Sequence, residues 1–177
     1  MRLRPWRRDD VPAIAEACRD QEIARWLDLV PQPYSESDAR AYMDNCRKGW
    51  RDGLGATFAV TDLWDEDVLG SIGLRLTDPI DAVAEVGYWV KSAARGRGVA
   101  SRALLLVSDW ALTVGGVQRL QLRADELNEP SKRVAERAGF TREGLLRSSH
   151  YNPRQGRRVD FVLYSLLPSD LGRRSQG

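Results

Sequence analysis

The sequence predicts a mixed α/β (α+β) fold, because strand-like segments come first in antiparallel runs and then alternate with helical segments. The clearest early signal is a hairpin pattern over residues 56–76, with an acidic turn at 64–67. The chain has 177 residues, of which 42% are hydrophobic and 29% charged, so it can form a core without disulfides or metals. We therefore expect a single domain over residues 1–171, followed by a disordered tail at 172–177.

Helical segments are predicted between a short opening strand and the hairpin. Asp9 or Asp10 can cap the first helix, because a carboxylate accepts hydrogen bonds from the N–H groups that a helix start leaves unpaired. A second helical piece covers residues 23–29. Ser35 and Asp38 fit a capping box, which predicts a third helix that runs to about Trp50.

The second half of the chain alternates between strands and helices. Residues 82–90 form a strand whose side chains alternate, so that Glu85 and Trp89 share one face and Val86 lies on the other. A basic loop with two glycines follows, and then a helix that is apolar on most of its sides. The remaining predicted elements are a strand at 118–124, a helix from Asn128 to Gly139 and a strand at 158–167.

Composition excludes several classes of protein. The formal net charge is only +2, whereas a dedicated nucleic-acid binder carries a larger basic excess. No apolar run reaches the roughly 20 residues that a membrane-spanning helix needs, and the N-terminus lacks the apolar segment of a signal peptide. We therefore expect a cytoplasmic protein without membrane contacts. With Cys18 and Cys46 far apart and His150 as the single histidine, we expect no metal site.

The segment from Arg95 to Ala100 carries the most informative pattern. It follows an apolar strand and opens a helix, whose first N–H groups and positive dipole end attract anions. Glycines allow the backbone to approach a phosphate closely, and Arg95 and Arg97 add positive charge. The spacing matches neither a Walker A loop nor a Rossmann fingerprint. The segment therefore predicts a pyrophosphate site; the alternatives are a solvated basic turn and, less consistent with a single embedded copy, an RNA-binding segment.

Arg95-Gly96-Arg97-Gly98-Val99-Ala100 resembles the acetyl-CoA loop of the GNAT superfamily of N-acetyltransferases. The strand 84–90, Asn128-Glu129-Pro130-Ser131 and Ala138-Gly139-Phe140 resemble further GNAT motifs in the same order. The opening residues, and Glu143-Gly144 with Leu146-Arg147, resemble the subgroup that acetylates serine or alanine at the N-termini of ribosomal proteins. The likeness covers nearly the whole chain. It implies a mostly antiparallel sheet of six to seven strands, splayed at its centre, with helices on both faces.

The resemblance also implies how acetyl-CoA, the expected co-substrate, is held. Backbone groups of Trp89 and Val90 would bind the pantetheine arm and polarise the thioester carbonyl. Asn128 would reach the pantetheine from the neighbouring segment. The pyrophosphate would lie against the loop and the first helical turn, at Arg95, Gly96, Arg97, Gly98, Val99, Ala100 and Ser101.

Two residues are candidates for catalysis. The subgroup has a glutamate at the position of Glu85, where a carboxylate can take the proton that an incoming amine must lose; the alternative is an ion pair across the sheet. Ser131 falls near the thioester sulfur in the resemblance, and the alternative is that it caps the helix start. Ala135 stands where many relatives carry a tyrosine that protonates the leaving thiolate. The identity of the general acid therefore stays open.

The resemblance implies transfer of an acetyl group to a primary amine, first of all the N-terminal α-amine of a ribosomal or other protein. Alternatives are a small amine (an amino acid, a polyamine or an antibiotic), a longer acyl group, and a non-catalytic acyl-CoA-binding module. Trp26, Tyr34 and Tyr151 are candidates for contact with the acceptor, although packing is the competing role. The oligomeric state also stays open, with a homodimer through the terminal strands as one alternative.

Overall fold

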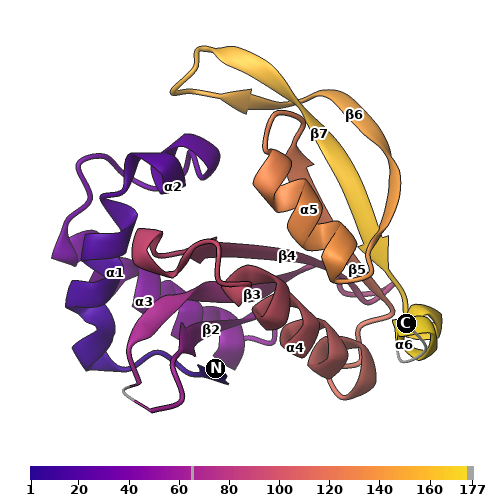
Figure 1. The fold of residues 1–177 in the computed structure, drawn as a ribbon, viewed down its shortest axis with the longest axis horizontal. Helices are drawn as coiled ribbons and strands as arrows, with labels where there is room; N and C mark the ends of the chain where they lie inside the picture. Colours follow the sequence, from indigo (N-terminus) through magenta and orange to yellow (C-terminus); the bar gives the residue numbers. More distant parts are fainter. Residues whose placement is uncertain (65, 175–177) are drawn as a thin grey trace. The chain divides into compact units, whose positions relative to one another are not determined.

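The computed structural model describes residues 1–64 and 66–174, and Figure 1 shows the order of its elements. Seven strands in these residues form one mixed, mostly antiparallel sheet in the order β1-β2-β3-β4-β5-β7-β6. The strands are β1 (Arg2–Arg4), β2 (Gly55–Thr61), β3 (Val68–Asp78), β4 (Val83–Val90), β5 (Arg119–Asp125), β6 (Thr141–Asn152) and β7 (Arg157–Leu166). The α-helices are α1 (Val11–Cys18), α2 (Gln21–Trp26), α3 (Glu36–Arg51), α4 (Val99–Thr113), α5 (Glu129–Arg137) and α6 (Pro168–Arg174).

The chain forms two compact units. The first comprises residues 1–75 and 88–100, and the second comprises residues 76–87 and the part of the chain from residue 101 onward. The N-terminal helices, the hairpin and the basic loop therefore belong to the first unit. The second unit contains β5, α5 and the long antiparallel pair of β6 and β7 (Figure 1).

Of the two helix caps predicted in the first unit, the capping box of α3 is confirmed and the side-chain cap of α1 by Asp10 is not formed. The Ser35 hydroxyl accepts from the Asp38 N–H at 3.2 Å, and the Asp38 carboxylate accepts from the Ser35 N–H at 2.8 Å, as the capping box predicts. Asp10, in contrast, does not cap α1 with its side chain. Its carboxylate accepts two hydrogen bonds from the buried guanidinium of Arg4, at 2.7 and 2.8 Å, and closes a short 3-10 turn by accepting from the Arg7 N–H.

The core of the first unit lies among α1, α3, β2 and the end of β4. Ile14 and Met43 are fully buried on the two helices, and Ala59 faces them from β2. The Trp6 and Trp89 rings stack in this core, with centroids 6.2 Å apart. Burying side chains of this size removes apolar surface worth about 2 kcal/mol each from water. The end of β4, from which the basic loop departs, is therefore anchored in a rigid core.

A buried thiol in the same core gives the protein a predictable response to alkaline pH. Burial raises the pKa of Cys18 from 9.0 to about 11, although a hydrogen bond with Tyr34 opposes the rise. Because the folded protein holds this proton more tightly than the unfolded chain, the stabilising effect is complete below pH 9 and is lost as the pH rises toward 11. We expect the free energy of unfolding to fall by about 2 kcal/mol over that interval from this group alone.

Urea denaturation at a series of pH values measures this effect. The Cys18→Ala variant should lose less stability than the parent between pH 9 and 11. It should not lose all of the dependence, because burial also raises the pKa of Tyr34 and of Tyr42. Equal slopes for variant and parent would show that Cys18 does not couple its proton to folding.

In the second unit, β4 and β5 pair in parallel over a short stretch, Val83–Glu85 with Arg119–Gln121. Both strands continue beyond this stretch, and the described register does not extend to Gly87 or Arg123. The described parallel pairing of β4 with β5 therefore ends at Glu85 and Gln121. β5 pairs along its length with β7, and β7 pairs with β6, both antiparallel.

The C-terminal end differs from the expected tail. α6 continues to Arg174 and so includes residues 172–174, while residues 175–177 lie outside the described part of the chain. The side chains of β6 are mostly exposed and show no simple alternation, so its pattern alone does not mark it as a strand. That β6 is a strand follows from its pairing with β7.

Candidate functional site

The loop between β4 and α4 has the backbone geometry of an anion site. After β4 ends at Val90, a short 3-10 turn leads to the exposed residues 95–98, and α4 begins at Val99. Gly96 and Gly98 have φ angles of +73° and +71°, a left-handed conformation that side chains strongly disfavour. Val99 is only 3% exposed, so the first turn of α4 is anchored while its N-terminal end stays accessible. The first N–H groups of an α-helix have no partner within the helix, so the start of this 15-residue helix is of the kind that can bind an anion.

The two arginines of the loop have different surroundings. The Arg95 guanidinium donates to the Asp20 carboxylate at 2.5 Å through Nη2, and to the Val90 carbonyl at 3.2 Å through Nε. Arg97 is exposed and has no hydrogen-bond or ion-pair partner among the described residues. The sequence suggested two equivalent charges, and the structure shows one engaged arginine and one available arginine.

Trp89 and Val90 precede the loop and are also fixed by their neighbours. The Trp89 side chain is 8% exposed, so contact with a ligand is left to its backbone. Gly70 on β3 allows the strands to approach here, because a Cβ atom at this position would lie 2.3 Å from the Trp89 carbonyl oxygen. Lys91 continues the contact by donating its N–H to the Leu69 carbonyl at 2.9 Å.

Glu85 lies in the second unit and forms an ion pair whose partner the sequence did not specify. Both of its carboxylate oxygens accept from the Arg123 guanidinium, at 3.0 and 2.9 Å. Arg123 lies two residues beyond Gln121, the partner of Glu85 in the β4–β5 register, and its guanidinium lies over the Phe161 ring. The cross-sheet ion pair considered for Glu85 is therefore present.

Asn128 and Ser131 lie together at the start of α5. The Asn128 side-chain oxygen accepts from the Ser131 N–H at 3.1 Å, and this bond caps the helix. The capping role considered for Ser131 thus belongs to Asn128. Ala135, one turn further along, is completely buried.

The three candidates for contact with the acceptor differ in exposure. Trp26 is half-buried at the end of α2 and donates its Nε1–H to Glu22 at 2.8 Å. Tyr34 belongs to the core of the first unit and is 5% exposed, which favours the packing role considered for it. Tyr151 lies on β6 in the second unit and is exposed.

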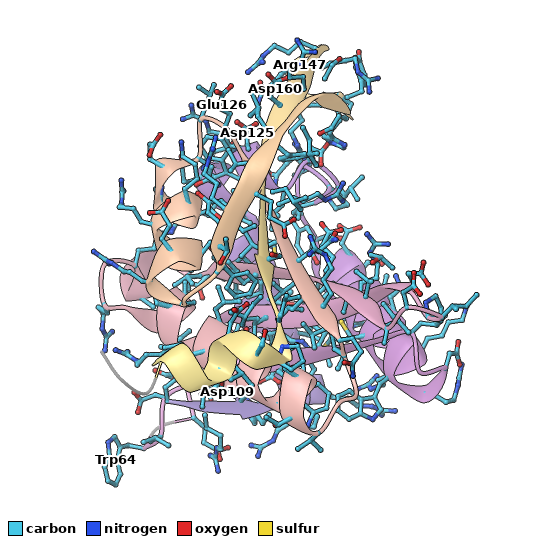
Figure 2. The ribbon with its side chains drawn as sticks, turned by 90° about the vertical axis from the view of Figure 1, so that its right-hand side faces the viewer. Trp64, Asp109, Asp125, Glu126, Arg147 and Asp160 are labelled. Atoms are coloured by element: carbon cyan, nitrogen blue, oxygen red, sulfur yellow. The ribbon has the colours of Figure 1, made fainter. Side chains whose placement is uncertain are left out.

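The Leu146-Arg147 motif falls where the pairing of β6 and β7 is irregular. The register shifts between Leu146 and His150, and Ser148 adopts a positive φ of 52°. The Ser148 N–H donates to the Asp160 carboxylate at 2.7 Å, and this bond fixes the irregular segment. Figure 2 shows the Arg147 and Asp160 side chains near the same end of this strand pair.

Other kinds of site find no support in the described residues. None of their helices is both long and apolar enough to cross a membrane. Nor do three or more His, Cys, Asp or Glu side chains gather there in an arrangement that could hold a metal ion.

Comparison with known proteins agrees with the arrangement of the loop and strands. A family model described as an acetyltransferase (GNAT) domain matches residues 1–141. The chain is 31% identical over 153 residues to YdaF of Bacillus subtilis (strain 168), which is named as a candidate ribosomal N-acetyltransferase; the match covers 83% of this chain and 79% of that protein. It is 29% identical over 131 residues to the ribosomal-protein-serine acetyltransferase of Escherichia coli (strain K12), covering 74% and 70% of the two chains.

A solved structure extends the likeness to the complete fold. The spermidine N-acetyltransferase of Vibrio cholerae, crystallised with CoA and spermine, superimposes with a TM-score of 0.80 at 22% identity and covers 96% of each chain. At this identity the comparison shows a shared fold. The family match and the identity to YdaF go further, and they show that this chain belongs to the GNAT family and is an N-acetyltransferase that uses acetyl-CoA.

Proposed function

We propose that the enzyme transfers the acetyl group of acetyl-CoA to the α-amine at the N-terminus of a protein. The observation that supports donor binding most directly is the left-handed glycine pair, Gly96 and Gly98, at the start of α4. The choice of acceptor is supported by the two relatives named for ribosomal substrates. It is also supported by the subgroup motifs in the opening residues and at residues 143–147.

The donor is held mainly by backbone groups in this proposal. The N–H groups from Arg97 to Ser101 bind the diphosphate, and the exposed Arg97 side chain adds charge. The backbone at Trp89 and Val90 binds the pantetheine arm. Asn128 uses its side-chain oxygen as a helix cap, which leaves its NH2 group to donate to the same arm. Acetyl-CoA supplies the acetyl group as a thioester, and these contacts position it against the amine.

Catalysis needs a neutral amine and a stabilised leaving group. Glu85 accepts the proton that the amine loses, directly or through a water molecule. The Ser131 hydroxyl donates a hydrogen bond to the departing sulfur. This bond stabilises the negative charge on the thiolate without protonating the sulfur. Ala135 is buried and carries no acidic group, so it cannot protonate the leaving thiolate.

A thiol-release assay tests the choice of acceptor. Acetyl-CoA is offered with peptides that begin with serine or alanine, with the same peptides blocked at the N-terminus, with free amino acids and with spermidine. We expect kcat/KM for the unblocked peptides to exceed that for spermidine by at least about 10-fold, a difference of about 1.4 kcal/mol. A preference for spermidine would replace the proposed acceptor with a polyamine. Acetyl-CoA binding without thiol release in any reaction would indicate a non-catalytic module.

Ser131→Ala should lower kcat about 10-fold and leave KM for the acceptor nearly unchanged. The expected size follows from the loss of one hydrogen bond to a charged group, about 1.5 kcal/mol or more. Stability should fall by at most about 1 kcal/mol, because Asn128 provides the side-chain cap of α5.

The matched control is Asn128→Asp, which keeps a capping oxygen but loses the NH2 donor. It should raise KM for acetyl-CoA more than it lowers kcat. Steady-state kinetics with thermal melts separates the two variants. If Ser131→Ala keeps the kcat of the parent, the sulfur is stabilised by another group.

A further inference from the structure

Asp20 is engaged by two different parts of the first unit at once. It immediately precedes α2, and its Oδ1 atom accepts from the Glu22 N–H at 2.8 Å, which caps that helix. Its Oδ2 atom accepts from Arg95 at 2.5 Å. One carboxylate therefore joins the start of α2 to the basic loop.

Arg95 extends this connection to the end of β4. While its Nη2 donates to Asp20, its Nε donates to the Val90 carbonyl at 3.2 Å. Val90 precedes the turn at 92–94, and Asp20 lies outside that turn. The guanidinium thus spans the turn by contacting both. The Arg95 side chain is exposed (37%) and the Asp20 side chain is half-buried (22%), so solvent screens this ion pair in part.

We propose that Asp20 is a positioning residue of the loop that binds the diphosphate of acetyl-CoA. Through Arg95 it holds residues 95–98 in the binding conformation before the ligand arrives. Arg95 then connects Asp20 to the backbone at Val90, and Arg97 supplies the side-chain charge for the phosphates. This inference rests on the proposed role of the loop. A loop that is already ordered gives up less conformational entropy on binding, and this saving appears as affinity.

For the loss of the Asp20 charge, the proposal predicts a change in acetyl-CoA affinity that is opposite in sign to the change that simple electrostatics predicts. Asp20 is an acid near a site for an anion, so removal of its charge alone should tighten acetyl-CoA binding. If Asp20 orders the loop, the same removal should weaken binding. Asp20→Asn is the appropriate variant, because asparagine caps helices as well as aspartate and so preserves the start of α2.

Calorimetric titration of acetyl-CoA into Asp20→Asn, Arg95→Gln and the double variant tests the proposal. We expect each single variant to bind about 10-fold more weakly, and the double variant to bind no more weakly than either. Such non-additivity is the signature of two residues that act as one unit. If Asp20→Asn binds as well as the parent or better while Arg95→Gln binds worse, Arg95 contacts the phosphates directly and the proposal is overturned.

Glu16→Gln is a matched control, because Glu16 pairs with Lys91 at 2.7 Å at the base of the same loop but is itself well exposed. It removes an equal charge and should not weaken binding. A second readout is amide hydrogen exchange of residues 95–98 in the ligand-free protein. Exchange should be faster in Asp20→Asn than in the parent and unchanged in Glu16→Gln, and equal rates in all three proteins would also overturn the proposal. A parent protein that fails to bind acetyl-CoA would contradict the proposed function of the loop, while the exchange rates would still decide whether Asp20 orders it.

Discussion

Gly98→Val is expected to weaken acetyl-CoA binding by at least about 100-fold, the equivalent of two lost charge-assisted hydrogen bonds. Gly98 lies directly before α4 with a φ of +71°, where a β-branched residue is strongly disfavoured. A side chain there would also occupy the space in which the first N–H groups of α4 meet a phosphate. Calorimetric titration measures the affinity, and thermal melts show whether the variant is folded.

Gly116→Val separates strain from the loss of the site. Gly116 has nearly the same φ, +73°, and a Cβ atom there would meet nothing within 4 Å. It follows α4 and lies outside the loop. The variant should therefore lose a similar amount of stability, about 1–2 kcal/mol, and keep the affinity of the parent. Binding by Gly98→Val as tight as that of the parent would remove the physical basis for placing the diphosphate at this loop.

Glu85→Gln is expected to lower kcat about 100-fold at neutral pH, the lower range of what a general base contributes. Raising the pH to about 9 should restore part of the rate, because an N-terminal amine with an ordinary pKa near 8 then loses its proton to solvent. The affinity for acetyl-CoA should hardly change. The measurement is a pH–rate profile with an N-terminal peptide as acceptor.

Arg123→Gln is the control that distinguishes a base from a structural ion pair. It breaks the same two hydrogen bonds but keeps the Glu85 carboxylate. If Glu85 is the base, Arg123→Gln should retain much more activity than Glu85→Gln. Equal activities, with pH profiles parallel to that of the parent, would show that Glu85 contributes only through its pairing with Arg123.

Features that depend on neighbouring residues could be predicted from the sequence, and features that depend on distant contacts could not. The Ser35 capping box, the cap at Asn128 and the glycine loop are each written within a few residues. The Arg95–Asp20 pair joins residues 75 positions apart, and the Glu85–Arg123 pair joins residues 38 positions apart. Both pairs depend on how the strands and helices pack, which no local pattern records.

Burial explains why Asp10 and Tyr34 differ from what the sequence predicted for them. Asp10 looked like a helix cap because it precedes α1, yet the packing of β1 places the Arg4 guanidinium beside it and engages both of its oxygens. Tyr34 was one of several aromatic residues in the helical part of the chain, and only its place in the core distinguishes it from Trp26. In each case the residue type was informative, and the deciding quantity was its exposure to solvent.

The double engagement of Asp20 has a consequence for the order in which substrates bind. Because one carboxylate stabilises both α2 and the loop, the two are thermodynamically linked, and such linkage is reciprocal. A ligand that stabilises the loop therefore also stabilises α2. The gain in the stability of α2 equals the gain in ligand affinity that an intact α2 provides. Trp26, a candidate for contact with the acceptor, is the last residue of this helix. The enzyme loaded with acetyl-CoA should therefore bind the amine more tightly than the empty enzyme does, which favours an ordered kinetic mechanism with the donor first.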